Sequence, residues 1–208
     1  MRSDCLARVV CLDVRHNFIT HYILSICAVL LTPVIFGLSE LSETLSAQPL
    51  EFVSCILGII LLVPIFMPEQ NQNIYDTVCS KKTNHEFVCL LRFICAVIML
   101  ILLISVLAFY MRCNGSKVTF RLYINTCING LFIGSLGFFA SGISENHVVG
   151  YMISASYFIM NLFLRNKFEK FDLFAMTGGH NELKYMLLIT ALSLTVATFV
   201  VRCAVKTK

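Results

Sequence analysis

Charged side chains are scarce in this sequence. Asp, Glu, Lys and Arg make up 13% of the 208 residues, whereas hydrophobic residues make up 58% and the mean hydropathy is +0.81. Soluble domains carry about 25% charged and about 45–50% apolar residues, so this chain has too few charges to cover a water-facing surface. The same composition excludes intrinsic disorder. The net charge of +4 is spread along the chain and does not indicate a nucleic-acid partner.

Several chemical motifs are also absent from the sequence. It holds ten cysteines but no CxxC pair, which excludes the spacing of a thioredoxin-type redox site or a zinc ribbon. We expect the cysteines of the apolar runs to behave as small hydrophobic residues rather than to form structural disulfides. There is no GxxxxGK[ST] phosphate-binding loop and no paired acidic cluster. The chain therefore has no ATPase or phosphotransferase motif of its own.

Long apolar runs are what the sequence does contain. About 20 apolar helical residues cross a bilayer core of about 30 Å, and the runs lack the alternation of barrel strands. We predict an all-α polytopic integral membrane protein in which residues 1–208 form a single transmembrane domain. The six predicted transmembrane helices cover residues 18–38, 52–67, 88–111, 122–143, 148–164 and 184–203. We expect no Asp, Glu, Lys or Arg deep in these spans, which argues against an ion-coupled transporter.

The leader, residues 1–17, contains three arginines and favours a cytoplasmic N-terminus. Its apolar residues recur at helical spacing, so we expect an amphipathic segment on the membrane surface. Six crossings return the C-terminus to the cytoplasm. The first external loop then carries acidic residues and no Lys or Arg, namely Glu40, Glu43 and Glu51. The second external loop is basic, however, so the charge balance alone leaves the orientation open.

The predicted fourth span carries small residues at four-residue spacing. Gly130 and Gly134 form one such pair, and Gly137 and Ser141 form another. Small residues at this spacing allow close approach of helices in lipid. The pattern fits packing within one subunit or at a subunit interface.

Three amides, Asn125, Asn129 and Asn161, lie at or near membrane depth. They fit hydrogen bonding between helices or a substrate path.

The connection between the second and third spans, residues 68–87, indicates a short amphipathic helix. Pro68 and Glu69 suit its first turn. An apolar face at helical spacing follows, made of Ile74, Tyr75, Val78 and Cys79. Lys81 and Lys82 suit its C-terminal end. Such a helix rests on the headgroups or docks a soluble partner.

The run VPIFMPEQNQNIYDTVCSKKT, followed by a span that opens with LLRF, resembles the permease subunit of a type-2 ABC exporter. In that family a span ends in a Pro-Glu element, a coupling helix follows, and the next span starts with Arg. The matching positions are Pro68, Glu69, Ile74, Tyr75, Thr77, Lys81, Lys82 and Arg92. With Val78, the positions from Glu69 onward are the candidate partner-coupling residues.

Two later stretches extend the resemblance over residues 50–203. SLGFFASGISENHVVGYMISASYFIMNLF resembles the tight hairpin between spans four and five of these permeases. The phenylalanines Phe168, Phe171 and Phe174 resemble the re-entrant external helix before the last span. We accordingly expect residues 165–183 to form an external interfacial segment.

The resemblance implies a multi-pass permease of a bacterial plasma membrane that exports a peptide, an antibiotic or a lipid-like substrate. The chain itself would hold no cofactor and would not be an enzyme. ATP and Mg would bind a separate soluble ABC ATPase subunit. A second permease copy or a paralogue would complete the pathway.

Two other classes remain open. Membrane endopeptidases that process signalling peptides use a Cys–His pair, and His85 and Cys89 are four residues apart. Gly178-Gly179-His180 is similar to a Gly-Gly-x-His element of those enzymes, but the next cysteine is Cys203. A non-transporting membrane anchor or sensor partner is the other alternative.

Overall fold

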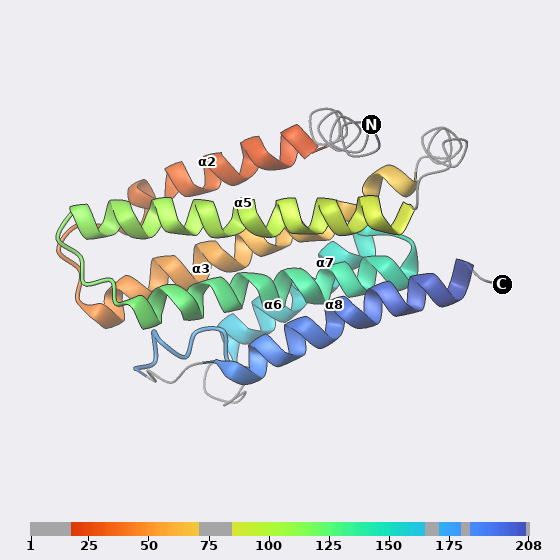
Figure 1. Cartoon of the computed structure of the whole chain (residues 1–208). Coiled ribbons are helices and arrows are strands. Elements are labelled where there is room, and N and C mark those ends of the chain that lie inside the picture. Colours follow the sequence, from red (N-terminus) through yellow and green to blue (C-terminus); the bar gives the residue numbers. More distant parts are fainter. Residues whose placement is uncertain (1–17, 71–84, 165–170, 180–183, 207–208) are drawn as a thin grey trace.

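The computed structural model describes residues 18–70, 85–164, 171–179 and 184–206 (Figure 1). All regular structure within these ranges is helical. The α-helices are α2 (Ile19–Phe36), α3 (Glu43–Leu62), α5 (His85–Cys113), α6 (Phe120–Ser144), α7 (His147–Phe163) and α8 (Tyr185–Lys206). A 3₁₀ helix, η2 (Val63–Gln70), continues from α3.

Each of the six predicted spans overlaps one of these α-helices, and the second also includes part of η2. Five of them, all but α7, lie in helical stretches that are long and apolar enough to cross a membrane. α7 is apolar but shorter, with 17 residues. The architecture is therefore all-helical and compatible with a multi-pass membrane protein.

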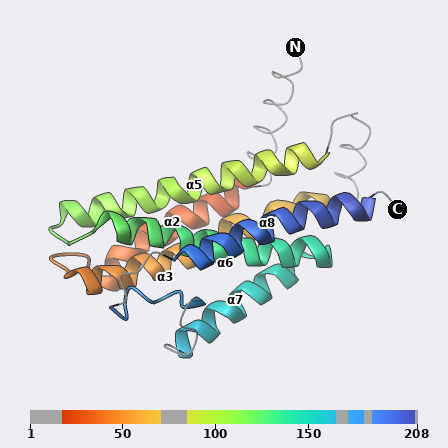
Figure 2. The same cartoon turned by 60° about the horizontal axis from the view of Figure 1, so that its bottom comes forward.

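The helices run back and forth between two ends of the bundle (Figure 1). At one end α2 begins, α8 ends, α6 turns into α7, and η2 ends close to the start of α5; we call this the terminal end. At the opposite end, the loop end, lie the α2–α3 and α5–α6 loops and residues 171–179. The two loops are joined by backbone bonds, because the Glu40 amide donates to the Asn114 carbonyl at 3.1 Å. Figure 2 shows α7 diverging from the other helices toward the loop end.

α6 is the central helix, since it packs against α3, α7 and α8 and is largely buried. Its small residues allow this packing. A Cβ atom at Gly134 would lie 2.8 Å from the carbonyl oxygen of Gly58 in α3, which is too close for any real side chain. A Cβ at Gly130 would lie 2.9 Å from the Ser54 carbonyl oxygen, also in α3.

The second pair of small residues faces α7. A Cβ at Gly137 would overlap the Ser154 hydroxyl group, and a Cβ at Gly150 would lie 2.9 Å from that of Ser141. The structure thus places all four predicted small residues in contacts within this one chain.

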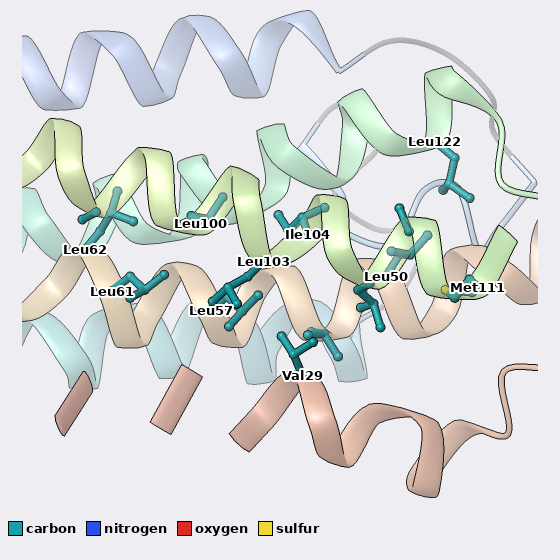
Figure 3. Packing of buried hydrophobic residues seen from close by; sticks show 14 of the residues in the cluster. Val29, Leu50, Leu57, Leu61, Leu62, Leu100, Leu103, Ile104, Met111 and Leu122 are labelled. Carbon is teal, nitrogen blue, oxygen red and sulfur yellow. The ribbon is translucent and has the colours of Figure 1, made fainter. Parts of the chain in front are cut away.

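Two hydrophobic clusters fill the bundle. The larger one contains interleaved side chains of α3 and α5, with Val29 of α2 and Leu122 of α6 at its edges (Figure 3). The smaller one joins α6 and α8 to Leu173 and Phe174. By contrast, α2 and α8 expose many large apolar side chains, as expected of helices that face lipid.

The second helix differs from its predicted bounds of 52–67. Ser42 has extended backbone before the first turn and Glu43 lies in that turn, a position that suits an acidic residue. α3 therefore begins nine residues before the predicted start, and Glu43 and Glu51 are helical rather than loop residues.

Pro68 lies inside η2, which continues from α3, rather than in the first turn of a new helix. The residues of the predicted coupling helix that follow, 71–84, lie outside the described residues. The chain changes from α to 3₁₀ geometry after Leu62.

Candidate functional site

A buried ion pair lies near the loop end of the bundle. Glu51 is fully buried in α3, about 12 Å along the axis from Glu43 at a rise of about 1.5 Å per residue. Lys184, the residue before α8, places its Nζ atom 2.9 Å from the Oε1 atom of Glu51. Glu51 is therefore an ionisable residue inside a helix that is long and apolar enough to cross a membrane, whereas the prediction placed it in a loop.

All three hydrogens of the Lys184 ammonium group have acceptors. Besides Glu51, Nζ donates to Asn129 Oδ1 at 3.0 Å and to the Leu173 carbonyl oxygen at 2.6 Å. An ammonium group has three donors and no acceptor, so its hydrogen-bonding capacity is filled. Because all three of its hydrogens are bonded, the ammonium group of Lys184 can remain buried.

The carboxylate of Glu51 is equally well satisfied. Its Oε1 atom also accepts the Met176 amide at 3.2 Å. Its Oε2 atom accepts the Thr177 amide at 3.1 Å and the Thr177 hydroxyl at 2.7 Å. A carboxylate offers about four acceptor positions, and here they are used by one side chain cation and by residues that follow α7.

The three amides predicted at membrane depth bind the same part of the chain. Asn129 donates to the Leu173 carbonyl at 2.7 Å, and Asn161 accepts the Leu173 amide at 2.9 Å and donates to the Phe171 carbonyl at 3.2 Å. Asn125 accepts the Lys184 amide at 3.2 Å. One expectation was that these amides would form hydrogen bonds between helices. They bind instead residues between α7 and α8 that are not part of an α-helix. In the described structure they do not line an open path.

We call Glu51, Lys184, Asn125, Asn129 and Asn161 the clamp, and residues 171–179 the returning segment. The segment is built of turns, and its Leu173, Phe174 and Met176 side chains are buried. The clamp binds backbone groups of the segment at four of its residues. The donors and acceptors of Glu51 and Lys184 are engaged in binding each other and backbone groups of the returning segment. We therefore interpret the clamp as a structural site that holds this segment, and not as a pair of acid–base groups.

The interfacial assignment of residues 165–183 needs correction within the described part. Phe174 is 2% exposed and its ring lies 6.0 Å from that of Phe158 in α7, whereas Phe171 is 41% exposed. Phe171 and Phe174 therefore do not share an exposed helix face, because residues 173–179 form turns. Phe168 lies outside the described residues.

Most of the predicted partner-coupling residues also lie outside the described residues, namely Ile74, Tyr75, Thr77, Val78, Lys81 and Lys82. Glu69 falls in the last turn of η2. Arg92 is buried in α5, and its Nη1 atom donates to the Ile65 carbonyl of η2 at 3.5 Å. The structure thus brings Arg92 to the segment from which the connection departs.

The proposed Cys–His pair of a peptidase is placed only in part. Cys89 is 3% exposed and belongs to the larger hydrophobic cluster, away from water. His85 is the first residue of α5, and His180 lies outside the described residues. Where the structure describes the cysteines, no disulfide joins them, namely Cys27, Cys55, Cys89, Cys95, Cys113 and Cys127. Nor does that part of the chain hold a group of three or more His, Cys, Asp or Glu side chains that could bind a metal ion.

Comparison with known protein families, with curated proteins and with solved structures finds no match for this chain. The site therefore has to be interpreted from its own geometry. Sequence reasoning missed Glu51, Lys184 and Thr177. The signal that could have revealed the pair is one acidic and one basic residue, each bordering a predicted span at the same side of the membrane.

Proposed function

We propose that this chain is the membrane-spanning permease subunit of an ATP-driven type-2 ABC transporter of exporter type, whose ATPase is a separate polypeptide. The observation that carries the proposal is the returning segment, which folds back into the bundle between α7 and α8 and is fastened there by the clamp. A re-entrant element before the last span is what the resemblance implies for such a permease.

The arrangement of the two ends of the bundle supports different roles for them. The connection between η2 and α5 leaves and re-enters at the terminal end, together with the first and last helices (Figure 1). The returning segment, to which the clamp is hydrogen-bonded, lies at the loop end. A soluble partner would therefore apply force at the terminal end. At the loop end, hydrogen bonds hold the returning segment in place.

In this mechanism the permease has no catalytic residue. Closure of two ATPase subunits on ATP and Mg would push on the residues 71–84 of two permease copies, or of this chain and a paralogue. The spans would then rock between inward-facing and outward-facing states. The chain would supply a path that shields a peptide, antibiotic or lipid-like substrate from lipid. Its connection between η2 and α5 would transmit the movement of the ATPase to the spans.

Recruitment of the ATPase tests the proposal directly. The full chain, purified from native membranes, should carry with it a soluble ATPase that has a phosphate-binding loop. Replacing Ile74 and Tyr75 together with Asp should abolish this recruitment while membrane insertion stays normal. Thr44→Asp with Leu45→Asp is the matched control, because these exposed residues add the same two charges at the loop end. Normal recruitment by the Ile74/Tyr75 variant would refute the coupling role.

The orientation has its own test in single-cysteine variants labelled from outside intact cells. Cys113 is exposed at the loop end, so an impermeant maleimide should label it. Cys79 should stay unlabelled until the membrane is opened. Labelling of Cys79 from outside would place the connection on the wrong side for an ATPase and would overturn the proposal.

A further inference from the structure

Four phenylalanines from four different elements meet at the terminal end of the bundle. Phe66 of η2 stacks on Phe138 of α6, with ring centroids 4.6 Å apart and an angle of 17° between planes. Phe93 of α5 lies 5.1 Å from Phe138, and Phe199 of α8 lies 5.7 Å from it. These separations fall in the range of favourable aromatic pairs. We call these residues the phenylalanine cluster.

Arg202 of α8 contacts the Phe66 ring of this cluster. Its guanidinium carbon lies 4.0 Å from the centroid of the Phe66 ring, which is the geometry of a cation–π contact. Phe66 is 3% exposed, so its ring has almost no access to solvent or lipid.

The backbone leaves little room for sliding at this place. A Cβ atom at Gly142 of α6 would lie 2.6 Å from the Thr198 methyl group of α8 and 3.2 Å from the Phe66 ring. η2 therefore packs, through Phe66, beside the close approach of α6 and α8. Arg92 reaches its backbone from α5, through the Ile65 carbonyl.

We infer that η2 and the C-terminal turns of α8 form one mechanical unit, joined through the contact of Arg202 with Phe66. Arg202 acts here as a positioning residue, because it fixes η2, the segment that directly precedes the connection to α5. The consequence for transport rests on the proposed function, because only then does a partner push on that connection. A push would pass into α8, which runs from Arg202 back to Lys184 in the clamp (Figure 1).

We call the contact of Arg202 with Phe66, which links η2 and α8, the joint. Hydrogen exchange measured by mass spectrometry on the detergent-purified full chain tests the joint without any partner. Arg202→Gln should speed amide exchange in residues 63–70 and in the C-terminal turns of α8 by about fivefold, the factor expected for losing a cation–π contact. Exchange in residues 171–179 and the melting temperature should stay unchanged. Arg202→Lys should restore most of the protection, since it keeps a cation.

Phe66→Leu should reproduce the effect of Arg202→Gln, and the double variant should exchange hardly faster than either single variant, because both changes remove the same contact. Arg112→Gln is the matched control, since Arg112 is an exposed arginine at the last turn of α5 and the loop end. Unchanged exchange of residues 63–70 in Arg202→Gln, or an equal effect of Arg112→Gln, would overturn the joint. These outcomes are independent of ATPase recruitment, whose failure would refute the proposed function and leave the joint standing.

Discussion

Lys184→Met is the sharpest perturbation of the clamp, because it removes one charge and leaves the other buried. Glu51 would keep its bonds from Met176 and Thr177 but would lose its ion pair with Lys184. Removing one partner of a buried ion pair destabilises a protein by about 3–5 kcal/mol. Glu51→Gln should have an effect of similar size, since it leaves a buried ammonium group.

Thermal unfolding of the purified chain, followed by circular dichroism, measures this effect. A chain of this size loses about 2–4 °C of melting temperature per kcal/mol, so each single variant should melt about 6–20 °C lower than the original protein. The double variant Glu51→Gln/Lys184→Met restores electrical balance. Its loss of stability should therefore be about 2–3 kcal/mol smaller than the sum of the two single losses.

Lys117→Met is the matched control, because Lys117 is exposed in the α5–α6 loop. Its effect should stay within about 0.5 kcal/mol. Additive losses in the double variant, or a Lys184→Met protein as stable as Lys117→Met, would refute the view that the pair is coupled and buried.

Two further predictions concern packing and the returning segment. Gly134→Ala should destabilise the chain by about 1–3 kcal/mol in the same assay, since its Cβ would lie 2.8 Å from the Gly58 carbonyl oxygen; an unchanged melting temperature would show that α3 and α6 have room to separate. Asn161→Leu removes the bonds to Phe171 and Leu173, so limited proteolysis should cut residues 171–179 faster while the helices stay intact; equal cleavage rates would mean that Asn161 does not hold the segment.

The helices could be predicted from the sequence because lipid demands long apolar stretches, and such stretches are visible without any tertiary information. The predicted span 122–143 and α6 (Phe120–Ser144), for example, differ by at most two residues at each end. The small residues of α6 were predictable for the same reason, since their spacing is a property of a single helix. Which helix each of them contacts was not.

The clamp could not be predicted because its members are far apart in the sequence and each has an ordinary local explanation. Glu51 looks like the last residue of a loop when a span is started at the first uninterrupted apolar run. The cation that pairs with this carboxylate, Lys184, lies 133 positions away, so no local pattern reveals the pair. Likewise, the turns of residues 171–179 depend on partners in α3, α6 and α7 that no local pattern encodes.

The two ends of the bundle are fastened by different kinds of force. Hydrogen bonds at the loop end are directional, and breaking one in a dry interior leaves its buried donor or acceptor unsatisfied. Stacked rings at the terminal end are held by dispersion, which is spread over many atoms and has no single direction. The terminal end is therefore held by the packing of rings such as Phe66 and Phe138, and the loop end by polar contacts such as the ion pair of Glu51 and Lys184. Separating the loop end would leave a buried charge without its partner, whereas separating the rings would cost packing contacts alone.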